Sequence, residues 1–386
     1  MEASSRSPHP YLAASALAVA LALSLQCLSF TAGHQADPAR MLRVADRSIP
    51  EGGRGFDGQF FLALAKDPLV GQATAKTLDS PVLRARRIGL PFTAWLLAPL
   101  VGGAAAGLLL AETVFLLLLV ALIHVEVRTQ GLPPFLCPTI ALLLPFVLSL
   151  ELATAELPTA VMLLLSAHEH RRGNRWTTLA TLAAACLFKE AAVLAVAAMG
   201  VNSILHGRRR ECLLRLACML PLIGWQAYLW LRFPKSTGIG GLLRNFELPG
   251  QGLLAAIANP LAEIAVAGFH PKQLALLTTT LWYLAGGVFA VLLLKKGSSD
   301  GRLTACFGAA VVLLLSYGGS AQAYNEIFNF GRQLFILVVG VLTTLLQETS
   351  SLSRHERVFI LAWLMLGATF GVSWWVQEIL TSSLAA

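Results

Sequence analysis

Residues 55–68 read Gly55-Phe56-Asp57-Gly58-Gln59-Phe60-Phe61-Leu62-Ala63-Leu64-Ala65-Lys66-Asp67-Pro68. From Asp57 onward, apolar side chains recur at the spacing of one helical face, and Pro68 ends the pattern. The stretch follows the first long apolar segment, which runs from Tyr11 to about Gly33. We therefore expect a short amphipathic helix at a membrane surface, placed directly after a first, uncleaved membrane helix.

The composition is that of a membrane protein. Of the 386 residues, 56% are hydrophobic and only 13% are charged. Repeated apolar runs of about 20 residues predict an all-α polytopic membrane helical bundle with about 10–12 transmembrane helices. We expect residues 1–386 to form a single transmembrane domain, with short interfacial helices in its extracytoplasmic loops. The six scattered cysteines form no Cys-x-x-Cys pair, so they predict neither a zinc site nor a redox site.

The charge pattern predicts an orientation. The formal net charge is +8, and most of the excess lies in short turns between apolar runs. This distribution is typical of cytoplasmic turns and does not indicate nucleic-acid binding. With the turns at 170–175, 207–210, 295–302 and 354–357 inside, the loops at 34–88, 232–272 and 324–332 face outward. The histidines in or beside these predicted cytoplasmic turns are expected to be solvated; they are His168, His170, His206 and His355.

One count is inconsistent with this orientation. Two helices in 89–127 and two more in 135–168 would leave residue 170 on the outside. One of the two regions must therefore hold an odd number of crossings, and the sequence does not say which.

Asp57 is the residue that best fits a catalytic role. A carboxylate just outside a membrane helix can act as a general base toward an acceptor hydroxyl. Gly55 and Gly58 flank it and would let a substrate approach the backbone closely. The alternative is a helix N-cap, for which Asp is among the preferred residues. The two roles are compatible.

Ionisable residues inside apolar runs form a second group of candidates. Lys189 and Glu190 interrupt the run 176–205, where charges are costly and usually functional. If both flanking basic turns are cytoplasmic, this run is a hairpin with the pair at its outer tip, on the Asp57 side. The alternative is a structural ion pair. Glu151 and Glu156 are five residues apart, which puts them on different helical faces and favours an outer turn or structural pairing.

Arginines near the predicted outer surface form the third group. Arg332 follows a polar, aromatic loop that includes Asn325 and Glu326, and Arg84 and Arg87 close the first loop. A guanidinium matches the oxygens of a lipid phosphate in its geometry. The alternative is ordinary snorkelling to lipid headgroups.

Three segments of the first loop together carry a resemblance to a known class. They are Asp57-Gly58-Gln59-Phe60-Phe61 with Ala65-Lys66-Asp67-Pro68, then Leu78-Asp79-Ser80-Pro81, then Arg86-Arg87-Ile88-Gly89-Leu90-Pro91. This region resembles the first outer loop of GT-C class integral-membrane glycosyltransferases. It is most similar to bacterial members distantly related to the GPI and protein O-mannosyltransferases. The specific part covers about 35 residues, and the order of helices extends it loosely over most of the chain.

The resemblance implies a role for Asp57. In that class, an acidic residue after the first membrane helix is the catalytic base, and the sugar comes from a polyprenyl-phosphate donor. Two departures are visible. Phe56 stands where many members carry Tyr or Trp. A single acid followed by Gly58 stands where some members carry two adjacent acids, which weakens the case for a metal there.

We therefore expect glycosyl transfer from a polyprenyl-phosphate sugar to the hydroxyl of a glycan, lipid or protein acceptor. Asp57 would be catalytic, and the donor phosphate would be held by Arg332 together with Arg84 or Arg87. The remaining expected substrate-binding residues are Gln59, Lys189, Glu190, Asn325 and Glu326. No metal cofactor is expected, and the active site would face outward from a bacterial inner membrane. The alternatives are a transporter or lipid flippase, which inverted repeats would favour, and a membrane acyltransferase, which relies on a His or Ser site.

Overall fold

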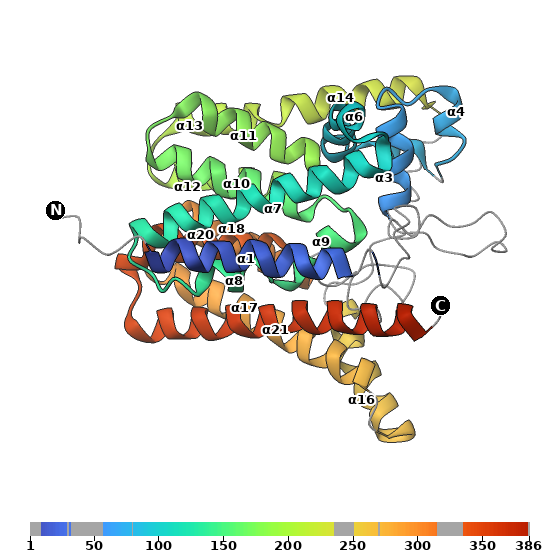
Figure 1. Ribbon diagram of the computed structural model, residues 1–386. Coiled ribbons are helices and arrows are strands. Elements are labelled where there is room, and N and C mark those ends of the chain that lie inside the picture. Colours follow the sequence, from blue (N-terminus) through green and yellow to red (C-terminus); the bar gives the residue numbers. More distant parts are fainter. Residues whose placement is uncertain are drawn as a thin grey trace.

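The computed structural model describes residues 9–28, 31, 57–78, 80–234, 251–268, 271–314 and 335–384. The elements in this part of the chain are all helices, which confirms the predicted all-α bundle. Figure 1 shows them stacked side by side, with most of the longer ones running between two ends. Their bounds are α1 His9–Leu28, α3 Asp57–Lys66, α4 Gln72–Ala75, α5 Pro81–Ala85, α6 Gly89–Val101, α7 Ala104–Thr129, α8 Leu136–Ala141, α9 Leu144–Leu152, α10 Glu156–Arg171, α11 Arg175–Phe188, α12 Ala192–Leu205, α13 Arg209–Ala217, α14 Leu220–Arg232, α16 Gln251–Ala267, α17 Pro271–Leu294, α18 Asp300–Leu314, α20 Phe335–Glu348, η3 Thr349–Ser351 and α21 Arg354–Leu384.

Five stretches of helix are long and apolar enough to cross a membrane. Such helices identify a membrane protein, because a crossing needs about 20 predominantly apolar residues. Other helices are shorter. α6, for example, has 13 residues, which span only about 20 Å at 1.5 Å per residue. The predicted total of about 10–12 crossings therefore stays a prediction. The five stretches are His9–Leu28, Ala104–Thr129, Arg209–Arg232, Gln273–Leu294 and Arg354–Val376.

The basic turns gather at one end of the bundle. Ser15 of α1 lies 2.8 Å from the Nδ1 atom of His124 near the end of α7. Two residues further along α7, the carboxylate of Glu126 contacts His168 and Arg171 at the end of α10. The start of α1 therefore lies beside the basic turn after α10. This agrees with the predicted placement of the N-terminus and that turn on one side of the membrane.

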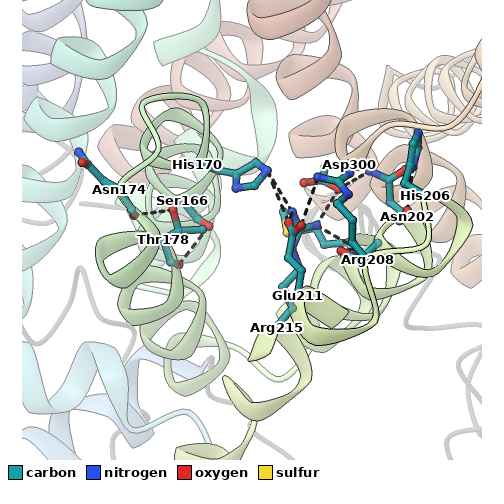
Figure 2. A network of polar contacts seen from close by, with 12 residues as sticks. Ser166, His170, Asn174, Thr178, Asn202, His206, Arg208, Glu211, Arg215 and Asp300 are labelled. Atoms are coloured by element: carbon teal, nitrogen blue, oxygen red, sulfur yellow. Dashed lines mark hydrogen bonds and ion pairs between the residues drawn. The ribbon is translucent and has the colours of Figure 1, made fainter. Parts of the chain in front are cut away.

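Arg215 of α13 joins further turns at this same end. Its guanidinium is 2% exposed and donates to the backbone oxygen of Met199 and to Asp300 and Glu211. It also lies 3.2 Å from Nε2 of His170, so α10, α12, α13 and α18 meet in one polar network (Figure 2). We call this end, with the turns after α10, α12, α17 and η3, the basic end. The opposite end, where α3, α4 and α5 lie, is the loop end.

The structure resolves the inconsistent crossing count. α6 packs against the first half of α7, where Gly107 faces the backbone of Ala94 and Ala98. Gly102 and Gly103 have φ of +80° and +149° and turn the chain sharply between the two helices. α6 therefore begins and ends in the loop-end half, and α7 alone runs to the basic end. Region 89–127 holds the odd number of traverses, whereas α8 and α9 run outward and α10 returns.

Two helices of the core approach each other at glycines. Gly340 of α20 faces the backbone of Ala305 in α18, and an added Cβ would collide with it. Gly308 of α18 likewise faces the backbone of Leu337 in α20. Small residues at such contacts let helices pack closely inside a membrane. All the residues of α9, which packs against α7, α10 and α21, are also buried.

Candidate active site at the loop end

The predicted amphipathic helix is present as α3, which begins at Asp57 and ends at Lys66. Its apolar face is buried, with Phe61, Leu64 and Ala65 each at most 2% exposed. This face packs against α6 and α7, so α3 lies on the bundle as an anchored element. The backbone of Asp57 therefore has a fixed place at the loop end. Its side chain lies outside the described part of the chain.

The turn after α3 is held by Asp67. Its Oδ2 atom accepts hydrogen bonds from the backbone N–H of Gly71 at 2.6 Å and from the Thr74 hydroxyl at 2.8 Å. Pro68 follows directly, as expected for the residue that stops the helix. Asp67 thus has a structural task at the far end of the helix that Asp57 begins.

α14 ties the first loop to the bundle through two aromatic side chains. The indole N–H of Trp225 donates to the backbone oxygen of Ala85 at 2.7 Å. The hydroxyl of Tyr228 donates to the backbone oxygen of Leu69 at 2.8 Å. The two rings are stacked, with centroids 5.2 Å apart. The loop is therefore fastened at both the α3–α4 turn and the end of α5.

Arg84 lies close to the start of α3. Its guanidinium carbon sits 4.2 Å from the centroid of the Phe60 ring, a cation–π contact. Phe60 is three residues after Asp57, and residues at this spacing share a helical face. The positive charge of Arg84 is thus placed beside the first turn of α3. Ser80 precedes α5 at the N-cap position and Pro81 opens that helix.

Arg87 and its neighbour Arg86 both form ion pairs with the carboxylate of Glu190. Arg87 donates to both oxygens of Glu190, at 2.8 and 2.7 Å, and Arg86 lies 2.6 Å from the same carboxylate. Desolvation in this packed turn would raise the pKa of Glu190. The charges of Arg87 and Arg86 and the hydrogen bonds from Arg87 outweigh it and hold that pKa below its usual value.

Lys189 points into the bundle and pairs with a different acid. Its Nζ atom is 2.5 Å from Oε1 of Glu156, and both side chains are at most 4% exposed. The ammonium also lies 4.8 Å from the centroid of the Phe335 ring at the start of α20. Lys189 and Glu190 are the tip of the α11–α12 hairpin, as predicted, and each has a separate counter-ion.

The other predicted acid of the apolar core also has a partner. Glu151, at the end of α9, accepts a hydrogen bond from the indole N–H of Trp375 in α21 at 3.0 Å. The chain breaks between α9 and α10, with Ala153 at φ +44°, so Glu151 and Glu156 belong to different helices. Structural pairing is confirmed for both.

The structure thus brings four of the predicted substrate-binding residues to the loop-end half: Gln59, Arg84, Arg87 and Glu190. Lys189, next to Glu190 in the sequence, is buried and pairs with Glu156. Gln59 is part of α3 and is partly buried. Asn325, Glu326 and Arg332 lie outside the described residues. Whether any of these side chains binds a substrate stays a prediction.

Sequence reasoning missed two buried glutamates on α7. Glu112 is fully buried and Glu126 is 3% exposed. Both interrupt an apolar run, and this was the available signal. The expectation of solvated histidines was wrong for His168, which is 14% exposed, because Glu126 approaches its ring to 2.5 Å.

A scan against protein-family models finds no match for this chain, and a search of curated proteins finds no match either.

Proposed function

We propose that the protein is a membrane glycosyltransferase that uses a polyprenyl-phosphate sugar and acts at the loop end. Asp57 takes the proton from the acceptor hydroxyl as that oxygen attacks the sugar. The acceptor–sugar bond forms while the bond from the sugar to the phosphate oxygen breaks. The electron pair leaves with the polyprenyl phosphate, whose charge Arg84 and Arg332 would stabilise.

The observation that supports this proposal best is the anchoring of the first loop. α3 is buried on α6 and α7, α14 fastens the loop through Trp225 and Tyr228, and Arg84 lies beside the first turn of α3. A catalytic base must be held in a fixed position to be effective. A fixed backbone at Asp57 with a cation nearby fits a base next to a phosphate site.

Arg87 has a different part in this proposal. Because Glu190 already occupies its guanidinium at two points, Arg87 would reach a phosphate only together with or in exchange for that carboxylate. Arg84 contacts the Phe60 ring, three residues after Asp57 in the first turn of α3. Because Arg84 contacts the helix that Asp57 begins, we place it ahead of Arg87 as a phosphate ligand from the first loop.

A transporter or lipid flippase is the second candidate, and one observation favours it. Lys189, Glu156 and Glu112 lie deep in the bundle, near the point where the helical chain breaks and reverses between α9 and α10. Transporters commonly place charges beside such breaks. A fastened surface loop with a carboxylate at its first helix is not needed for transport, and this favours the enzyme.

The test is sugar transfer by the purified protein in nanodiscs, with a panel of radiolabelled polyprenyl-phosphate sugars and membrane-derived acceptors. Wild-type protein should transfer one of these sugars, and Asp57→Asn should not. Metal independence predicts the same rate in excess chelator. Substrate movement across sealed proteoliposomes without any transfer would favour the transporter.

A further inference from the structure

α7 carries two buried glutamates whose surroundings differ. Glu126, near the basic end, accepts from the guanidinium of Arg171 and contacts His168. Glu112, in the loop-end half, is fully buried and has one hydrogen-bonding neighbour, the Ser149 hydroxyl at 3.5 Å. Its Oε1 atom has no hydrogen-bond partner in the described part of the chain. A charged carboxylate is costly in such a place.

The hydrogen bonds of Ser149 indicate which atom carries a proton. A hydroxyl has one hydrogen to donate and two lone pairs. The Ser149 oxygen lies 2.5 Å from the backbone oxygen of Thr154, which must accept that hydrogen. The backbone N–H of Leu157 donates to one lone pair at 3.0 Å. Only the other lone pair is left for Glu112, so Glu112 can bond to Ser149 only by donating a proton of its own.

The charge balance of the cluster leads to the same result. Glu156 and Lys189 form an ion pair, and Glu156 acts electrostatically on Glu112. If Glu112 were ionised, the three side chains would carry a net negative charge with almost no exposure to water. With a proton on Glu112, the group is neutral. Burial in an apolar interior strongly favours the neutral arrangement.

Among the residues that the structure describes, the helices packed against α7 place no further cation beside Glu112. The helices α1, α6 and α8 contain no Asp, Glu, Lys or Arg. α3 carries Asp57 and Lys66 at its two ends, and α20 carries Glu348 at its last position. The other titratable groups of α7 and α10, from His124 to Arg128 and from His168 to Arg171, lie at the basic end. Among the described helices packed against α7 and their ion-pair partners, the charged groups that remain in the loop-end half are Glu151 at the end of α9 and the Glu156–Lys189 pair. Glu151 lies against Trp375.

We propose that Glu112 is a proton-binding site inside the bundle, occupied at neutral pH, with Ser149 as the acceptor of its O–H. The break between α9 and α10 builds the site, because it brings the backbone oxygen of Thr154 and the backbone N–H of Leu157 to the hydroxyl of Ser149. Glu156 stays ionised beside it as the partner of Lys189. Proton binding at Glu112 does not depend on glycosyl transfer and would be present in a transporter as well.

Infrared spectroscopy of the protein in nanodiscs tests this directly. A protonated carboxyl group gives a C=O band that is separate from carboxylate bands and shifts in D₂O. Wild type should show this band at pH 7, and Glu112→Gln should lose it. Glu112→Asp keeps an acid at the position and should shift the band. Glu126→Gln is the matched control on the same helix and should leave the band in place.

The outcomes separate the possible occupants. Loss of the band in Glu112→Gln and its retention in Glu126→Gln would support the proposal. An unchanged band in both Glu112 variants, or its absence in wild type, would overturn it. Thermal unfolding in sodium-free and sodium-containing buffer adds a second arm. A melting temperature that rises with sodium in wild type, but not in Glu112→Gln, would contradict the proposal and show that the site binds a cation instead of a proton.

Discussion

The guanidinium of Arg87 contacts the carboxylate of Glu190 at two points, with Nε 2.8 Å from Oε2 and Nη2 2.7 Å from Oε1. The two residues are 103 positions apart and join the first loop to the tip of the α11–α12 hairpin. Lys189, the residue before Glu190, pairs with the buried Glu156. The Arg87–Glu190 contact is therefore the link between the proposed catalytic surface and the polar interior of the bundle.

Arg87→Lys should lower stability, because a lysine keeps the charge but cannot make the two-point contact. We expect a loss of roughly 1–2 kcal/mol, between the values for exposed and buried ion pairs. Thermal unfolding in detergent measures it. Arg172→Lys is the matched control, since Arg172 is 64% exposed and lies 3.9 Å from Glu169. Equal melting temperatures for the two variants would contradict the structural importance of the Arg87–Glu190 contact.

The pH dependence of stability should change in Glu190→Gln. The pKa of Glu190 is lowered in the folded protein, so its ion pairs stabilise the fold above the ordinary Glu value of about 4.3. That contribution is lost as the pH falls below this value toward the folded-state pKa. Wild type should therefore lose more stability than Glu190→Gln between about pH 5 and pH 3. Parallel melting curves across this range would contradict the prediction.

Gly340→Ala should destabilise the α18–α20 contact, because the new methyl group would overlap the backbone of Ala305. Overpacking of this kind costs roughly 1–3 kcal/mol, and a clash with backbone belongs at the upper end. Gly224→Ala in α14 is the control, since an added Cβ there has nothing within 4 Å. Denaturant or thermal unfolding compares the two, and a Gly340→Ala protein as stable as Gly224→Ala would rule out the close helix contact.

Lys189→Met should be strongly destabilising, because it removes the ammonium that pairs with the buried carboxylate of Glu156. Breaking a buried pair from one side costs about 3–5 kcal/mol. Adding Glu156→Gln should restore part of the loss, since the second change removes the uncompensated charge. A double-mutant cycle measures the coupling. Additive effects would mean that the two side chains do not depend on each other.

Local features of the site could be predicted from the sequence. The spacing of Phe60, Phe61 and Leu64 gives the buried face of α3, and Pro68 marks its end. The charged Lys189 and Glu190 inside an apolar run mark the hairpin tip. These features depend on residues that are close together in the sequence, so one short stretch is enough to predict each of them.

The partners of these residues could not be predicted. Arg87 with Glu190, Glu151 with Trp375, and Glu112 with Ser149 each join distant parts of the chain. Their pairing depends on how helices pack, which hydrophobic periodicity does not specify. The sequence left undecided whether region 89–127 or region 135–168 holds the odd number of crossings, for a related reason. α6 is apolar enough to read as a crossing, but it is short and packs along the first half of α7.

The measurement that tests the proposed function most directly compares Asp57→Asn with Asp67→Asn in the transfer assay. Both changes remove one carboxylate from an end of the α3 region, but Asp67 holds the turn at Gly71 and Thr74. A general base contributes roughly 10²- to 10⁴-fold to the rate. We therefore expect the transfer rate of Asp57→Asn to fall by about this factor while the protein stays folded. Asp67→Asn should keep most of its transfer activity but have a lower melting temperature. Equal activity of Asp57→Asn and wild type would contradict the assignment of Asp57 as the base.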